Sequence, residues 1–203
     1  MTNPEYAHIG LIVDRSGSMI AIKSDMEGGL RTFLKEQAAL PGKCLVDFSI
    51  FDTEFDEVYT NRPVKSATVQ IKPRGGTALL DAIGKAVVSL GERLAALSED
   101  DRPETVIVAI ITDGMENSSR EWTLDKVKEL IETQQSQWSW KFVFLGANMD
   151  AVSVGGGMGM AKGMSMGYEA SAAGTRIGTQ SLSNYTTAVR GGDKDAKLDE
   201  ESA

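Results

Sequence analysis

Apolar residues in this chain form short continuous runs that alternate with stretches of helical periodicity. The first run, residues 8–13, ends in Asp14, and the runs at 106–111 and 142–145 contain no polar residue. Such runs are typical of strands that are buried on both faces of a parallel sheet. We therefore predict a buried strand at each of these three places.

Between and after these runs, apolar residues recur every three or four positions, which indicates amphipathic helices. The stripes lie at 19–34, 79–97, 124–131 and 182–189, and a small-residue helix is expected around 149–154. The β-rich runs 45–51 and 54–59 are separated only by Asp52-Thr53. This spacing favours a hairpin at the edge of the sheet.

Strands that alternate with helices in this order predict an α/β fold of the Rossmann-like, doubly wound type. We expect a mostly parallel central sheet with an antiparallel edge strand and helices on both faces. The length of 203 residues fits one domain, which we assign to residues 1–190. Residues 191–203 are polar and lack periodicity, so we expect a flexible acidic C-terminal tail.

Residues 155–167 are rich in glycine and methionine, and two interpretations compete. Thioethers are ligands for soft metals, but no Cys or His accompanies these methionines. We therefore expect a loop whose methionine side chains fill gaps in the core. The four methionines are Met158, Met160, Met164 and Met166.

The charge and composition exclude several classes of function. A formal net charge of −8 without a basic patch argues against nucleic-acid binding. Cys44 is the only cysteine, so we expect a buried thiol and no intrachain disulfide. No run of 18 apolar residues and no leader pattern occurs, so we expect a cytoplasmic protein that does not contact a membrane.

Polar residues with ligating oxygens follow the predicted strands and open a predicted helix. Asp14, Ser16 and Ser18 occupy alternate positions of one loop, Thr77 opens the 79–97 helix, and Asp113 ends a strand. Each residue alone is explained by a helix cap or a turn. Ligands of open α/β sheets bind at the carboxyl ends of the strands, where all three loops are expected to meet. Capping does not explain that joint arrangement.

The sequence Asp14-Arg15-Ser16-Gly17-Ser18, with Thr77 and Asp113 downstream, resembles the metal-ion-dependent adhesion site of von Willebrand factor A domains. The resemblance spans residues 6 to about 190 and is greater to compact bacterial or bacteriophage members than to animal adhesion receptors. It implies that these five side chains hold Mg²⁺ or Mn²⁺, directly or through water. None of the five is substituted in this sequence.

The chemistry of these side chains agrees with the resemblance. A set made only of oxygens suits a hard cation, and Mg²⁺ is the first expectation. Two carboxylates and three hydroxyls leave one octahedral position open for water or a ligand, and we expect the carboxylate of an Asp or Glu of a partner protein to fill it. Asp81, Glu116 and Asn117 are expected either to orient metal-bound water or to serve ordinary helix-start and turn roles.

These observations predict a divalent-cation-dependent protein-binding module, monomeric, without catalytic residues, and therefore not an enzyme. A Mg²⁺-dependent hydrolase of phosphate or ester substrates is an alternative, because metals activate bound water. No nucleophile–base pair and no phosphate-binding loop is visible, and His8 is interpreted as structural. A structural assembly protein that uses the same site is the third hypothesis.

Overall fold

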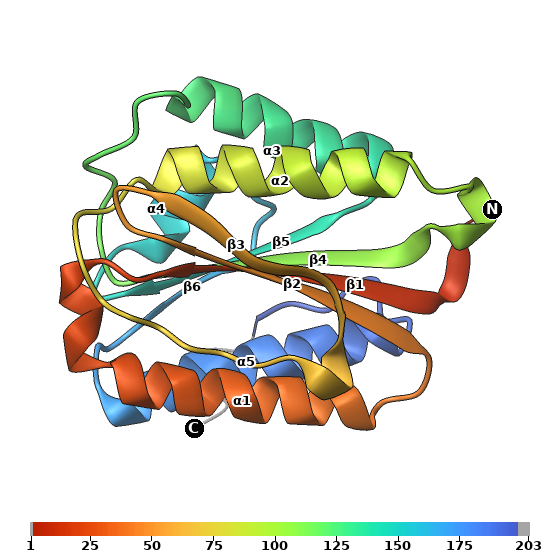
Figure 1. Cartoon of the computed structure of the whole chain (residues 1–203), viewed down its shortest axis with the longest axis horizontal. Coiled ribbons are helices and arrows are strands. Elements are labelled where there is room, and N and C mark those ends of the chain that lie inside the picture. Colours follow the sequence, from red (N-terminus) through yellow and green to blue (C-terminus); the bar gives the residue numbers. More distant parts are fainter. Residues whose placement is uncertain (1, 199–203) are drawn as a thin grey trace.

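A sheet of six strands runs through the centre of the molecule in the order β3-β2-β1-β4-β5-β6 (Figure 1). The computed structural model describes residues 2–198. The strands are β1 (Asn3–Asp14), β2 (Lys43–Phe51), β3 (Phe55–Pro63), β4 (Pro103–Thr112), β5 (Lys141–Ala147) and β6 (Ser165–Tyr168). All neighbouring pairs are parallel except β2 and β3, which are antiparallel.

Five α-helices cover the two faces of this sheet. They are α1 (Lys23–Ala39), α2 (Leu79–Ala95), α3 (Leu124–Trp138), α4 (Ala151–Gly157) and α5 (Ala172–Arg190). In Figure 1, α1 and α5 lie below the sheet, and α2, α3 and α4 lie above it. Short 3-10 turns are η1 (Gly17–Ala21), η2 (Val64–Ser66) and η3 (Glu99–Asp101).

Alternation along the strands divides the core into two layers. In β1, Ile9 and Leu11 face α1 and α5, whereas Ile12 faces α2, α3 and α4. All three side chains are almost fully buried. A strand covered on both faces has no polar side, which explains its continuous apolar run. The predicted α/β fold with its antiparallel edge hairpin is therefore confirmed.

Two local predictions differ from the structure. The predicted first helix begins with the turn η1, and its α-helical part starts only at Lys23. The segment that was expected to be a loop contains β6, which pairs with β5 as a sixth strand. Its sequence, Ser-Met-Gly-Tyr, is short and not uniformly apolar, so it carries no strand pattern.

The methionines of the 155–167 segment pack as expected. Met158, Met160 and Met166 are buried, and Met164 packs against the core as a partly buried side chain. They occupy both layers, which is consistent with flexible side chains that fill irregular gaps.

The chain continues past α5 through a turn at Gly191 and Gly192. Leu198 is 9% exposed, and its amide donates to the Gly163 carbonyl at 3.1 Å. The first part of the expected tail thus lies against the domain, while residues 199–203 are outside the described residues. Flexibility of the tail in solution stays a prediction.

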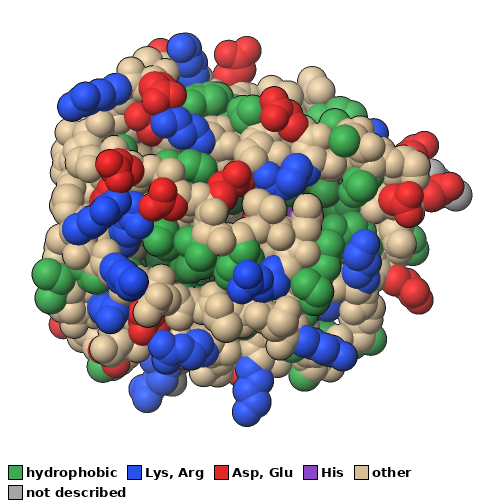
Figure 2. Space-filling model, viewed as in Figure 1, with side chains coloured by type: hydrophobic (Ala, Val, Ile, Leu, Met, Phe, Trp, Pro, Cys, Tyr) green, Lys and Arg blue, Asp and Glu red, His purple; other side chains and the backbone are tan. Residues whose placement is uncertain are grey.

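Acidic and basic side chains are mixed on the visible surface, most densely at the upper left of Figure 2. Within residues 2–198, no helix has the length and apolar character needed to cross a membrane.

Candidate metal centre

The three loops predicted to carry ligands meet at one edge of the sheet. Asp14 is the last residue of β1, and Asp113 follows the last residue of β4. Because β1 and β4 are parallel neighbours, their carboxyl ends lie side by side. The loop with Thr77 arrives at the same edge as it leads into α2.

The loop after β1 folds tightly around the Asp14 carboxylate. The Ser16 amide donates to Asp14 Oδ1 at 2.5 Å, and the chain then enters η1. The Ser16 and Ser18 hydroxyl oxygens are 3.0 Å apart. Asp14 and Ser16 are buried, whereas Ser18 is exposed. These oxygens therefore form a path from the interior to the surface.

Two hydrogen bonds join this loop to the end of β4. The Ser18 hydroxyl donates to Asp113 Oδ1 at 2.6 Å, and the Thr112 hydroxyl donates to Asp14 Oδ2 at 2.5 Å. Residues separated by more than 90 positions in the sequence are thus in direct contact.

Thr77 reaches the same place from the third loop. A Cβ atom added to Gly114 would lie 2.9 Å from Thr77 Oγ1 and 3.7 Å from Asp14 Oδ2. A glycine is therefore required here for the loops to approach one another closely. The structure brings together all five residues of the predicted site: Asp14, Ser16, Ser18, Thr77 and Asp113.

Burial of two neighbouring acids shapes the electrostatics of the site. Burial raises the pKa of Asp14 to about 6, the charge of Asp113 adds to the rise, and hydrogen bonds from Thr112 and Ser16 oppose it. Burial also raises the pKa of Asp113, against hydrogen bonds from Ser18, its own backbone and Ser16. A bound cation would favour the ionised form of both groups.

The donor set fits a hard divalent cation. It combines two carboxylates with three hydroxyls, without nitrogen or sulfur, as Mg²⁺ and Mn²⁺ prefer. Among residues 2–198, no cluster of three or more His, Cys, Asp or Glu side chains is placed to hold a metal. A cation at this edge would therefore depend on the hydroxyls as well as the two acids.

Asp81, Glu116 and Asn117 hold the loops in place. Asp81 accepts hydrogen bonds from the amides of Arg120, Glu121 and Trp122. Glu116 accepts from the amides of Leu80, Ser118 and Ser119 and from the Ser119 hydroxyl. Asn117 Oδ1 accepts from the Thr77 amide at 2.9 Å. These contacts match the helix-start and turn roles, and the orientation of metal-bound water stays a prediction.

Three residues near the site escaped the sequence analysis. Thr112 bonds Asp14, and its position directly before Asp113 is the signal that could have drawn attention to it. Asp52, which the sequence places only in the turn of the predicted hairpin, is 1% exposed and accepts hydrogen bonds from two arginines. Burial and the charges of Asp113 and Asp14 raise the pKa of Tyr168. No motif marks Asp52 or Tyr168.

His8 and Cys44 lie in the core, away from this edge. His8 is fully buried, with Nδ1 3.1 Å from the Tyr6 hydroxyl and Nε2 3.0 Å from Asp47 Oδ1. Cys44 is a buried free thiol, as expected. The surroundings of both side chains are those of core residues, which is consistent with the structural role expected of His8.

Comparison of the sequence with models of protein families and with curated proteins gives no match. Solved structures do share the fold. The pilus adhesin SpaC from Lactobacillus rhamnosus GG, in its open conformation, superposes with a TM-score of 0.66 at 14% identity, over 88% of this chain and 29% of the adhesin. The von Willebrand factor type A protein from Catenulispora acidiphila gives 0.60 at 14% identity, over 90% of this chain and 43% of that one.

Proximal thread matrix protein 1 from the mussel byssus, whose structure is described as having a zinc-occupied MIDAS motif, also gives a TM-score of 0.60 at 14% identity. The superposition covers 89% of this chain and 46% of the mussel protein. The chain thus spans less than half the length of each of these three proteins.

Proposed function

We propose that this chain, which has the von Willebrand factor A fold, is a protein-binding module that depends on a divalent cation, Mg²⁺ or Mn²⁺. Asp14, Ser16, Ser18, Thr77 and Asp113 would hold the ion, directly or through water. When bound, the ion supplies a positive charge at the surface, to which an acidic group can attach.

One observation carries this proposal: five oxygen-bearing side chains from three loops meet at a site that is closed on one side and open on the other. Asp14, Ser16 and Thr77 are at most 3% exposed, whereas Ser18 is exposed and Asp113 is half-buried. An ion held there would have protein ligands beneath it and solvent on the Ser18 and Asp113 side. Magnesium retains exchangeable positions in such sites.

The charge count supports an acidic partner. Two carboxylates neutralise a divalent ion at most, so an aspartate or glutamate of a partner protein can complete the shell by a charge-assisted contact.

Two exposed apolar side chains lie near the candidate ligands in the sequence. Ile20 follows Ser18 by two positions and is 71% exposed, and Met115 follows Asp113 by two positions and is 60% exposed. A partner acid next to an apolar residue therefore fits this surface.

The test is calorimetric titration of the metal-free protein with Mg²⁺, Mn²⁺ and Zn²⁺. We expect one Mg²⁺ or Mn²⁺ site in the wild type, lost in Asp113→Ala and retained in Asp101→Ala, an acid in η3 at the opposite end of β4. A site for zinc alone, or equal Mg²⁺ binding in Asp113→Ala, contradicts the proposal.

The protein-binding part is tested by selecting phage-displayed random peptides in Mg²⁺ and eluting them with EDTA. Enrichment of acidic peptides supports the proposal. Peptides retained in EDTA contradict it. Turnover of p-nitrophenyl phosphate or acetate that requires both Mg²⁺ and Asp113 would favour a hydrolase instead. Metal-dependent self-association in sedimentation, without enriched peptides, would favour the assembly role.

A further inference from the structure

Asp52, in the turn between β2 and β3, touches two of the three loops of the candidate metal centre. We propose that Asp52 is a positioning residue that holds these two loops in the arrangement that binds the ion, without itself contacting the ion. This inference rests on the metal-binding function proposed above. It assigns a role to a buried acid that the ligand set leaves unused.

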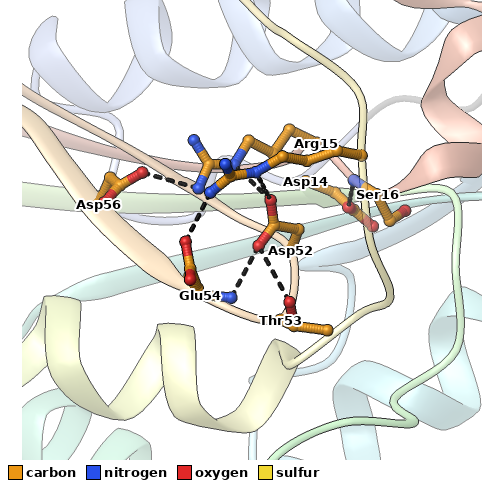
Figure 3. Close-up of polar contacts among 8 residues, drawn as sticks. Asp14, Arg15, Ser16, Asp52, Thr53, Glu54 and Asp56 are labelled. Carbon is orange, nitrogen blue, oxygen red and sulfur yellow. Dashed lines mark hydrogen bonds and ion pairs between the residues drawn. The ribbon is translucent and has the colours of Figure 1, made fainter.

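The first attachment is to the loop of Asp14, Ser16 and Ser18, and it runs through Arg15. The Arg15 Nε atom donates to Asp52 Oδ2 at 2.8 Å, and the Arg15 amide donates to the Phe51 carbonyl at 2.7 Å. Figure 3 shows the Arg15 side chain lying over Asp52, away from Ser16. Arg15 lies between the candidate ligands Asp14 and Ser16 in the sequence. Contacts that fix the side chain and the backbone of Arg15 therefore restrict the positions of both neighbours.

The second attachment is to the loop of Thr77, and it holds the chain on both sides of that residue. Before Thr77, the Arg74 Nε atom donates to the same Asp52 Oδ2 at 2.6 Å. After Thr77, the Ala78 amide donates to the Asp52 carbonyl at 2.7 Å. One residue therefore links Arg15 and the segment 74–78.

The two loops also bond each other where Asp52 holds them. The Arg74 amide donates to the Arg15 carbonyl at 2.7 Å, and the Gly17 amide donates to the Gly75 carbonyl at 3.2 Å. Gly75 has a φ of 68°, and a Cβ there would lie 3.3 Å from Asp52 Cβ. The loop thus passes Asp52 in a conformation that favours glycine.

Asp52 is itself fixed and ionised. Its Oδ1 accepts from the Glu54 amide at 2.7 Å, and its side chain is 1% exposed. Burial acts to raise the pKa of Asp52, but hydrogen bonds from Arg74 and Glu54, together with the charges of both arginines, hold it below its ordinary value. Charge-assisted bonds of this kind are both strong and directional.

The neighbouring acids allow the loss of the Asp52 contacts to be distinguished from the loss of one negative charge. Asp56 lies 2.7 Å from Arg15 Nη2 but is 52% exposed, and Glu54 lies 2.6 Å from Arg74 Nη2 but is 69% exposed. Figure 3 shows both beside Arg15 and Asp52. Asp56→Asn removes the same formal charge from the same cluster and leaves the bonds from Asp52 to both loops. It is therefore the matched control for Asp52→Asn.

The experiment combines Mg²⁺ titration with amide hydrogen exchange in the metal-free protein. Asp52→Asn should weaken Mg²⁺ binding by about tenfold, as for other residues that orient metal ligands, and Asp56→Asn by about twofold at most. Exchange should accelerate in segments 14–18 and 74–78 of Asp52→Asn while β4 and β5 remain protected. Arg74→Gln alters a 56% exposed side chain and tests the second attachment if Asp52→Asn does not fold.

Equal weakening of Mg²⁺ binding in Asp52→Asn and Asp56→Asn would overturn the inference, and so would unchanged exchange in both loop segments of Asp52→Asn. Faster exchange throughout the sheet would show a role in global stability and would overturn it as well. Absence of Mg²⁺ binding in the wild type refutes the proposed function instead. The exchange measurement then still decides whether Asp52 holds the loops.

Discussion

Hydroxyl groups belong to three of the five side chains in the candidate metal centre, and each is held differently. Ser16 lies buried beside Asp14, Ser18 is exposed and donates to Asp113, and Thr77 lies close to Gly114. A neutral oxygen attracts a cation less strongly than a carboxylate does. The loss of one hydroxyl should therefore reduce metal affinity less than the loss of an acid.

Thr77→Ala tests this difference. The variant removes one neutral oxygen and leaves both carboxylates, so we expect Mg²⁺ affinity to fall by less than in Asp113→Ala. Affinity for an acidic peptide selected in Mg²⁺ should fall more than Mg²⁺ affinity itself, because the open position is no longer correctly presented. Calorimetric titration of both ligands measures the two effects. Equal loss of both affinities would assign Thr77 to metal retention alone.

Ile20 and Met115 should affect the partner and not the metal. Neither side chain carries a ligating oxygen, and both are largely exposed. We expect Ile20→Ser and Met115→Ser to preserve Mg²⁺ affinity and to weaken peptide binding severalfold, since buried apolar area is lost at the contact. Val88→Ser, at a 36% exposed position in α2, serves as the control. Unchanged peptide affinity in both variants would show that the partner contacts the ion alone.

Helix α2 connects the core to the edge of the sheet that carries the candidate metal centre. Its first turn begins two residues after Thr77, and Asp81 accepts three amides of the segment 120–122. The indole of Trp122 packs against Gly84 of the same helix. Helix α2 thereby fixes two loops: the loop that follows Asp113 and the loop of Thr77, which leads into the helix.

Two glycines of α2 should respond in opposite ways to alanine. A Cβ at Gly84 would overlap the Trp122 ring, whereas a Cβ at Gly91 meets its nearest neighbour, Trp140, at 3.9 Å. We expect Gly84→Ala to lower the free energy of unfolding by about 2 kcal/mol through overpacking. Gly91→Ala should raise it by up to about 1 kcal/mol through helix propensity. Urea denaturation of both variants provides the measurement, and equal shifts would contradict the packing.

A second buried polar cluster lies apart from the candidate metal centre and joins several elements of the molecule. Asp47 of β2 is 3.0 Å from His8 Nε2 on β1, 2.5 Å from Arg93 Nη2 on α2, and accepts the Asn61 amide of β3 at 2.6 Å. Burial acts to raise the pKa of Asp47, but His8, Asn61 and Arg93 together hold it below its ordinary value. This carboxylate joins three strands and one helix.

Stability should therefore depend on pH through Asp47. A lowered pKa in the folded state means that the carboxylate stabilises the protein above the unfolded pKa of about 3.9, and that this is lost as pH falls through the folded value. We expect Asp47→Asn to cost about 2 kcal/mol at pH 7 and progressively less as the pH approaches 3. Urea denaturation across this range measures the difference. A constant difference would contradict ionisation of Asp47 as the cause.

The layers of the fold and the five candidate ligands could be predicted from the sequence. Apolar runs such as 106–111 specify buried parallel strands because period and length are local properties. The five candidate ligands could be predicted because Asp14, Ser16 and Ser18 lie within one loop and, with Thr77 and Asp113 downstream, resemble a known motif. Strand β6 was missed because four residues with a serine and a glycine carry no such local pattern.

The residues that surround the candidate site could be identified only from the three-dimensional structure. Asp52 is 37 positions from Arg15 and 22 from Arg74, so their shared contact has no sequence period. The Thr112 bond to Asp14 likewise spans 98 positions and exists only because β1 and β4 are neighbours in the sheet. The candidate ligands can be identified from short sequence motifs. Their placement depends on long-range hydrogen bonds that form only once the sheet has been assembled.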